Sequence, residues 1–138
     1  MHEMALAEGV VVTALESARR EGRPILRLNV KVGQLQQIET DILRHCLDGV
    51  LPKDEPLLAG MQVLVDLSPA CLRCRLCRHD FRLDDLESPP DSTELEAIHF
   101  VPELAHSYIK CPGCGSPDFE VVSGRGVWIE SIELEPGP

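Results

Sequence analysis

The sequence contains few aromatic residues and no long hydrophobic run. Aromatic side chains account for 4% of the 138 residues, whereas hydrophobic residues of all kinds account for 43%. A core must therefore be built mainly from Leu, Val, Ile and Ala. The apolar run from Val10 to Val12 is far shorter than the roughly 20 residues that a membrane-spanning helix needs. The first residues also lack the basic and apolar regions of a signal peptide, so we expect a cytoplasmic protein that does not bind membranes.

Positive charge is scarce as well. The chain has 13 Lys and Arg against 23 Asp and Glu, which gives a formal net charge of -10. Proteins that bind nucleic acids usually present a basic face to the phosphates, so this charge argues against a nucleic-acid partner. A phosphate-binding loop, a dinucleotide fingerprint and a Ser/His/Asp arrangement are also absent, so we do not expect an enzyme.

Two segments have the periodicity of amphipathic helices. Residues 3–22 repeat apolar side chains at helical spacing, and Gly22 and Pro24 end the pattern. The second helix follows Thr40 or Asp41, either of which would serve as its N-cap, and ends before Pro52.

Three segments alternate apolar and polar residues, which is typical of half-buried strands. They are residues 25–33, 60–67 and 127–135. In the first strand we expect every second side chain to face the core, namely Leu26, Leu28, Val30 and Val32.

The cysteines are concentrated between these segments. In a cytoplasmic chain, cysteines indicate metal or redox chemistry more readily than disulfides. "CLRCRLC" contains two overlapping CxxC pairs, 71/74 and 74/77, and "CPGCG" contains the pair 111/114. A phenylalanine, Phe81 or Phe119, follows each of the pairs 74/77 and 111/114 at a similar distance. We therefore predict one metal site with these ligands: Cys74, Cys77, Cys111 and Cys114.

Zinc is the metal that best suits four thiolates, with iron in a rubredoxin-like site as the alternative. A closed Cys₄ shell leaves no position for a reacting water, so we interpret the site as structural. Two domains follow from this pattern. Residues 1–69 and 123–138 form an α/β layer, and residues 70–122 form a zinc ribbon inserted into it.

The N-terminus could hold a second metal. The α-amine of Met1, the amide and imidazole of His2 and the amide of Glu3 can form fused chelate rings. Nitrogen donors in a plane suit Ni(II) or Cu(II) better than Zn(II). This site requires that Met1 is retained, and by itself the tripeptide is better explained as a disordered start and the polar first turn of a helix.

Several segments together resemble the HypA/HybF family of nickel metallochaperones for [NiFe]-hydrogenase maturation. They are "MHEMALA", "VKVGQLQQIE", "CRLC…CPGCGS" and "SGRGVWIESIELE". The resemblance implies an α+β fold, with two helices on a three-stranded sheet and an inserted Cys₄ zinc ribbon. It also implies that nickel binds through Met1, His2 and Glu3, with Glu39 at the family's acidic position, and that zinc binds the four cysteines chosen above.

Partners follow from the same resemblance. Members of this family pass nickel to a HypB-type P-loop nucleotidase and to the hydrogenase large-subunit precursor, and some also serve urease. The sequence is compatible with a monomer, a homodimer or a strand-swapped dimer.

The spacer of residues 78–110 is longer than in many family members. Its second half has a helix-like pattern and contains His99. We hypothesise that His99 completes the nickel site, although an ordinary histidine packed beside Phe100 explains the same residues. Two other functions stay open: a zinc-ribbon module that binds nucleic acid or protein without nickel, and an enzyme with a catalytic zinc.

Overall fold

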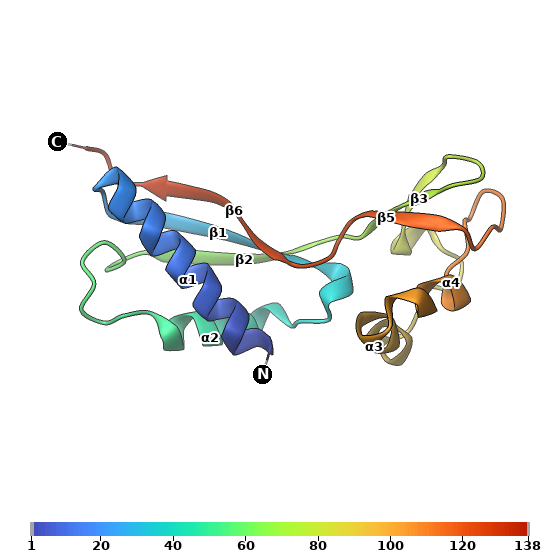
Figure 1. Ribbon diagram of the computed structural model, residues 1–138, viewed down its shortest axis with the longest axis horizontal. Helices are drawn as coiled ribbons and strands as arrows, with labels where there is room; N and C mark the ends of the chain where they lie inside the picture. Colours follow the sequence, from blue (N-terminus) through green and yellow to red (C-terminus); the bar gives the residue numbers. More distant parts are fainter. Residues whose placement is uncertain (1, 138) are drawn as a thin grey trace. The chain divides into compact units, whose positions relative to one another are not determined.

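The computed structural model describes residues 2–137, with the backbone but not the side chain of His2. The chain forms two compact units (Figure 1). The first comprises Met1–Val32, Ile38–Leu67 and Val127–Pro138, and the second comprises Gly33–Gln37 and Ser68–Gly126.

The first unit consists of two helices and a three-stranded sheet (Figure 1). Its helices are α1 (His2–Glu21) and α2 (Thr40–Val50), and its strands, in spatial order, are β2 (Gln62–Ser68), β1 (Ile25–Gly33) and β6 (Val127–Leu134). Both helices and β1 contribute to a single cluster of buried aliphatic side chains. The predicted fold class, two helices on a three-stranded sheet, is confirmed.

Helix α1 ends where the sequence predicts. Gly22 adopts a φ of 65°, and its amide donates to the carbonyl of Ala18 at 2.8 Å. Glycine adopts this left-handed conformation without steric penalty, which makes it the usual residue after a helix C-terminus. Arg19 and Arg20 lie in the last turn, where cations interact favourably with the helix dipole.

Strand β1 departs from simple alternation at its start. The antiparallel register between β1 and β6 shifts between Ile25 and Arg27. Ile25 is fully buried, whereas Leu26 is 47% exposed, so the prediction that Leu26 faces the core was wrong. An extra residue in the pairing changes which side chains point inward. Beyond this irregularity the predicted residues are buried: Leu28, Val30 and Val32.

The second unit has a smaller antiparallel sheet and short helices (Figure 1). Its strands, in spatial order, are β4 (Asp80–Arg82), β3 (Cys71–Cys74) and β5 (Phe119–Ser123). The long spacer contains α3 (Ser92–Phe100) and α4 (Ala105–Tyr108), which confirms its predicted helical character. Three short 3₁₀ segments complete the unit: η1 (Gln34–Gln36), η2 (Leu83–Asp85) and η3 (Pro102–Leu104).

The segment Gly33–Gln37 groups with the second unit because of its hydrogen bonds. The amides of Gly33 and Leu35 donate to the carbonyls of Gly126 and Gly124, each at 2.8 Å. A Cβ at position 33 would collide with the carbonyl of Gly124, so only glycine fits there.

The contact of residues 33–37 with Ala70 and residues 124–126, all in the second unit, is called the junction. Two glutamine side chains hold it. The side-chain oxygens of Gln34 and Gln36 accept hydrogen bonds from the amides of Ala70 and Gly126, each at 2.9 Å. The two glutamines of "GQLQ" thus supply acceptors for the backbone amides of Ala70 and Gly126.

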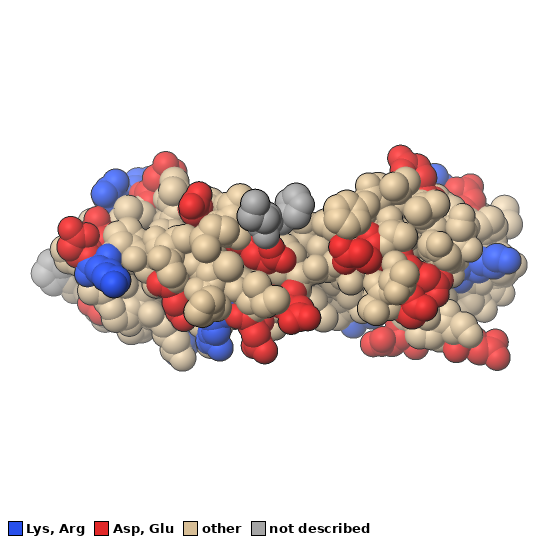
Figure 2. Space-filling model, turned by 90° about the horizontal axis from the view of Figure 1, so that it is seen from below, with Lys and Arg blue, Asp and Glu red and all other residues tan. Residues whose placement is uncertain are grey.

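The surface is predominantly acidic (Figure 2), as the net charge predicts, and the helices of residues 2–137 are not long and apolar enough to span a membrane, as the short hydrophobic runs predict. On the face seen in Figure 2, Asp and Glu side chains are spread over both units, while Lys and Arg are sparser. Within residues 2–137, none of the helices combines the length and apolarity that crossing a lipid bilayer requires.

Candidate metal centre

The first cysteine pair lies in a tight turn between β3 and β4. Cys74 is the last residue of β3, and its amide donates to the carbonyl of His79 at 2.9 Å. The amide of Arg78 donates back to the carbonyl of Cys74 at 3.0 Å. Arg78 adopts a φ of 66°, which is unusual for a residue with a side chain.

The second pair has the same backbone arrangement. The amide of Cys111 donates to the carbonyl of Ser116 at 2.9 Å, and the amide of Gly115 donates to the carbonyl of Cys111 at 2.8 Å. Gly115, four residues after Cys111, has a φ of 77°. It therefore occupies the position that Arg78 occupies four residues after Cys74. The two turns are structurally equivalent, and each directs two thiols to the same side.

The four thiols converge on one point. Their sulfur atoms all lie within 4.8 Å of one another. The Sγ atoms of Cys74 and Cys114 are 3.5 Å apart, and those of Cys77 and Cys111 are 3.6 Å apart. Zinc–sulfur bonds of about 2.3 Å in a tetrahedron place the sulfur atoms about 3.8 Å apart. The observed separations are close to that value.

Backbone amides stabilise negative charge on the sulfur atoms. The amide of Cys77 donates to Cys74 Sγ at 3.4 Å, and the amide of Gly113 donates to Cys111 Sγ at 3.3 Å. The hydrogen bond from Cys77 is the main reason that the pKa of Cys74 is lowered to about 6.

The thiols of Cys77 and Cys114 resist ionisation. The amide of His79 lowers the pKa of Cys77, but burial and the thiol of Cys111 outweigh it and raise that pKa to about 12. The pKa of Cys114 is also raised: the amide of Ser116 lowers it, but the thiol of Cys74 and burial prevail. Thiols this close cannot all become anions unless a cation offsets their repulsion.

These features fit a divalent metal with four thiolate ligands. The donor set is all sulfur, the separations suit a tetrahedron, and amides point at two of the sulfur atoms. Among the residues whose side chains are described, this is the one group of three or more His, Cys, Asp or Glu with metal-binding geometry. Zinc is the metal that such a site suits best.

The surrounding residues fix the turns. Phe81 and Phe119 are buried and pack edge to face, with ring centroids 6.1 Å apart. Across the β3–β4 pair, Arg73 Nε donates to Asp80 Oδ1 at 2.7 Å. This hydrogen bond lowers the pKa of the Asp80 carboxyl and joins the strands that present the first turn.

The other two cysteines lie outside this group. Cys71 begins β3, opposite Arg82 and Ser123 of the neighbouring strands, and is partly buried. Cys46 is partly buried against the core of the first unit.

The residues predicted for nickel are only partly described. Met1 and the side chain of His2 lie outside the described residues. Glu3, half-buried, is in the first turn of α1. The nickel site at the N-terminus therefore stays a prediction.

Glu39 and His99 belong to different units. Glu39 is exposed and occupies the N-cap position of α2, so the predicted cap, Thr40 or Asp41, was wrong. The first bond of the helix runs from the amide of Leu43 to the carbonyl of Glu39 at 3.1 Å. His99, half-buried, lies in α3, with its ring 5.4 Å from that of Phe100.

Some structurally important residues were not singled out from the sequence. The amide of Gly113 and the backbone of Gly115 shape the second turn, and Gln34 and Gln36 support the junction. The glycines of "CPGCG" carried a signal for the turn. Nothing local marks the two glutamines, because their acceptor role depends on amides distant in sequence.

Comparison with known proteins places the whole chain in one family. The sequence model of that family, described as "Hydrogenase/urease nickel incorporation, metallochaperone, hypA", matches residues 1–134. The hydrogenase maturation factor HypA of Pyrococcus abyssi is 39% identical over 136 residues, covering 98% of this chain and 96% of the relative. HypA of Thermococcus onnurineus is 40% identical with the same coverage.

Two solved structures share the fold. The solution structure of the Ni metallochaperone HypA from Helicobacter pylori aligns with a TM-score of 0.59 over 96% of both chains. A second solution structure of a HypA protein aligns with a TM-score of 0.62 over 98% of this chain and 97% of the other. Sequence identity is 15% in both cases, so these likenesses bear on the fold.

The family description gives nickel as the transported metal, and the four sulfur atoms of the second unit suit zinc. The match spans nearly all of the sequence, and both of the named relatives are similar over almost their entire length. This chain therefore belongs to the HypA family of hydrogenase and urease nickel-incorporation metallochaperones.

Proposed function

We propose that this protein binds Ni(II) at its N-terminus and delivers it during [NiFe]-hydrogenase maturation, while zinc holds the second unit together. Membership of a family described by nickel incorporation is the observation that carries this proposal. Zinc would bind to Cys74, Cys77, Cys111 and Cys114, whose sulfur atoms already converge. Bound there, zinc would supply charge compensation and a cross-link rather than a reaction.

Nickel needs a different set of ligands. Four thiolates would complete the coordination of zinc and leave no position for a second ion. Nitrogen donors in a plane suit Ni(II), and the chain offers them at its first residues. We assign nickel binding to the amine of Met1, the imidazole and amide of His2 and the amide of Glu3, with Glu39 and His99 as further candidates.

Delivery requires partners. We propose a HypB-type P-loop nucleotidase and the hydrogenase large-subunit precursor as the proteins that receive nickel.

We also propose that the protein forms a homodimer, and light scattering of the purified protein with and without nickel would distinguish it from a monomer. Hydrogenase and urease are alternative clients, which competition between the two apoenzymes for nickel would separate.

The main experiment changes the position of the terminal amine. We expect a Gly-Ser extension before Met1 to weaken nickel binding by about tenfold or more, because it removes the amine of Met1 as a ligand, and even the loss of a residue that only supports a ligand costs about that much affinity. His2→Ala should have a similar effect. Isothermal titration with nickel measures both, and zinc content should be unchanged. Equal affinity of native and extended proteins would contradict the assignment.

The role of His99 is tested with a matched pair of histidine variants. His99→Ala should weaken nickel binding and change its absorption spectrum if the imidazole is a ligand. His45→Ala, which removes an exposed histidine of α2, is the control and should change neither. An unaltered titration for His99→Ala would remove this residue from the site.

Acid should release the two metals separately. Protonation of imidazole competes with nickel, so nickel should be bound above the ordinary histidine pKa of about 6.5 and lost as the pH falls below it. Zinc on four thiolates should remain bound over that range. Loss of both metals in one step of a pH titration would count against two independent sites.

A further inference from the structure

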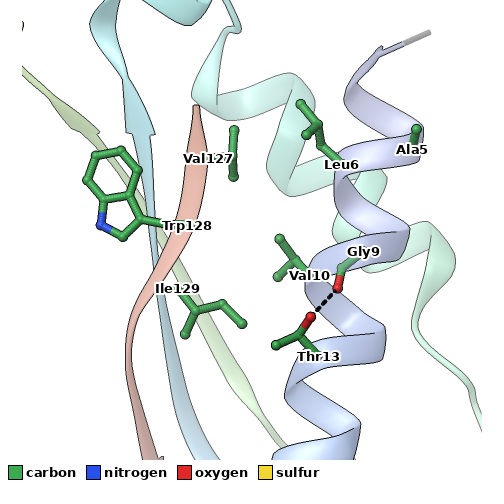
Figure 3. A pocket seen from close by; sticks show the side chains of 8 residues that line it. All are labelled: Ala5, Leu6, Gly9, Val10, Thr13, Val127, Trp128 and Ile129. Atoms are coloured by element: carbon green, nitrogen blue, oxygen red, sulfur yellow. Dashed lines mark hydrogen bonds between the residues drawn. The ribbon is translucent and has the colours of Figure 1, made fainter. Parts of the chain in front are cut away.

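An apolar groove lies between α1 and β6 in the first unit (Figure 3). Its volume is about 470 Å³, and neither helix nor strand contributes a charged residue to its lining. The lining residues are Ala5, Leu6, Gly9, Val10 and Thr13 from α1, and Val127, Trp128 and Ile129 from β6. The groove is therefore shaped to accept apolar side chains rather than an ion.

The wall on α1 is built from small, exposed residues. Ala5, Gly9 and Thr13 are spaced by one helical turn, and all three are exposed. The hydroxyl of Thr13 donates to the carbonyl of Gly9 at 2.8 Å, so its polar atom is satisfied within the helix (Figure 3). A Cβ at Gly9 would meet no atom within 4 Å. Glycine inside a helix destabilises it relative to alanine, and nothing within this unit requires glycine here.

The opposite wall is the free edge of a sheet. Val127 and Ile129 point toward α1, whereas Trp128 points to the other face (Figure 3). In the sheet order β2–β1–β6, strand β6 is terminal and, within the described residues, pairs with β1 alone. It contains no Pro or Lys, which are residues that commonly block the edge of a sheet. Its register with β1 skips Glu130, so a bulge divides the edge into residues 127–129, beside the groove, and residues 131–134, and each of these stretches is open to pairing with another strand.

The charges on β6 indicate which kind of strand could pair with its free edge. Glu130 and Glu133 are about half exposed, and each also contacts a cation of β1, Lys31 at 3.5 Å or Arg27 at 3.0 Å. The strand carries no positive residue of its own. Pairing with β6 of a second copy would bring these glutamates onto one face with their own equivalents, which is unfavourable. Cationic side chains at those positions would instead be attracted.

We propose that the groove and the β6 edge bind an extended segment of a partner protein, which adds to the sheet as a fourth strand. One face of that segment carries small or branched aliphatic side chains, which enter the groove. Its other face carries Lys or Arg, which lie beside Glu130 and Glu133. Main-chain hydrogen bonds supply affinity, and the alternating side chains supply specificity.

This surface is independent of the metals. All of its residues belong to the first unit, and none is among the ligands assigned to zinc or nickel. The groove begins at Ala5, one helical turn after the first residue of α1. A segment bound there would lie beside the start of the helix.

The test uses a synthetic peptide of alternating lysine and valine with blocked ends, added to the full-length protein. Trp128 is the one tryptophan of the chain and belongs to β6, with its ring on the face of the sheet away from α1 (Figure 3), so its fluorescence reports a segment that pairs along β6. A peptide of the same length that alternates glutamate and valine is the control. We expect a saturable change in tryptophan fluorescence with the lysine–valine peptide and none with the glutamate–valine peptide. Amide hydrogen exchange of β6 should slow when the peptide is bound.

Substitutions separate the groove from the charges. Gly9→Leu should weaken binding of the lysine–valine peptide by about tenfold or more, because its side chain occupies the groove. Gly49→Leu is the matched control. Gly49 is an exposed glycine within α2, and a Cβ there would also meet no atom within 4 Å, so this variant should bind the peptide normally. Reversing the charges with Glu130→Lys and Glu133→Lys should make the glutamate–valine peptide the better ligand.

Three outcomes would overturn the proposal. The first is equal binding of both peptides, and the second is no binding of either at millimolar concentration. The third is a dimer that Gly9→Leu converts to a monomer in light scattering, because the occupant would then be a second copy. Thermal melts of each variant show that it is folded.

Discussion

The two units of this protein are held together by different means. The buried cluster of the first unit is aliphatic throughout and draws on α1, α2, β1 and β2. The buried cluster of the second unit includes two of the converging cysteines, Cys74 and Cys111, together with Phe81 and Phe119. In the first unit apolar burial is the stabilising force, whereas the second unit places its metal ligands within its own core.

This difference indicates how the two units should respond to change. Apolar burial contributes roughly 25 cal/mol per Å² and does not depend on any bound ion. Ligands that converge on a metal stabilise a small core only while the ion joins them, because metal binding supplies folding free energy. The first unit should therefore stay folded without a metal, whereas the stability of the second unit should depend on how fully its metal site is occupied.

Removal of the metal should have the largest effect. With a strong chelator, we expect amide exchange across β3, β4 and β5 to become fast, while α1 and β1 keep their protection. Structural zinc sites contribute on the order of 10 kcal/mol to folding. Cys111→Ser should act like the chelator, and Cys71→Ser, which alters a thiol outside the group, should not. Loss of protection in both units together would contradict this contrast.

Truncation of core side chains should distinguish the units next. Leu28→Ala in β1 and Leu72→Ala in β3 each remove a fully buried side chain and should cost about 2–5 kcal/mol. Added zinc should restore the thermal stability of Leu72→Ala in part, because binding to the folded state adds to its stability. It should not help Leu28→Ala. Calorimetry at several zinc concentrations measures both, and equal rescue would be evidence against separate units.

The junction should be the next most sensitive place. Gly33→Ala would push a Cβ into the backbone of Gly124 and should cost about 1–3 kcal/mol. Gly9→Ala is the control, because Gly9 lies in a helix with open space around it and should gain about 0.5–1 kcal/mol. Urea unfolding followed by circular dichroism compares the two. A neutral Gly33→Ala would mean that the junction relaxes without cost.

The smallest effects are expected within the second unit, between its two equivalent turns. Gly115→Ala places a side chain at a φ of 77° and should cost about 1–2 kcal/mol. Arg78→Gly relieves the same conformation in the first turn, but glycine also gains freedom in the unfolded chain, so the gain should be below about 1 kcal/mol. Zinc affinity from competition with a chromogenic chelator should change in the same directions.

Local patterns in the sequence predicted the helices and strands of the first unit. The helical repeat gave α1, Gly22 gave its end, and the cysteine spacing gave the four thiols that converge. These predictions succeeded because the physical cause lies within a few residues of the feature. The choice of 74/77 over 71/74 depended on the phenylalanines that follow each pair, and both are indeed buried beside the turns.

Other features depend on pairing between distant segments. Leu26 is exposed because the register with β6 shifts at the start of β1, and no pattern within β1 contains that information. The grouping of Gly33–Gln37 with the second unit depends on bonds to Gly124 and Gly126, far along the chain.

The sequence by itself therefore determined the four converging thiols, the helices and strands of the first unit and the family, since each depends on short-range spacing or motifs. The tertiary structure alone decided which strand edge is left open, which leucine faces solvent and which glutamines satisfy backbone amides. Those outcomes depend on hydrogen-bond register and on the packing of α1 against β6, which exist only once distant segments meet.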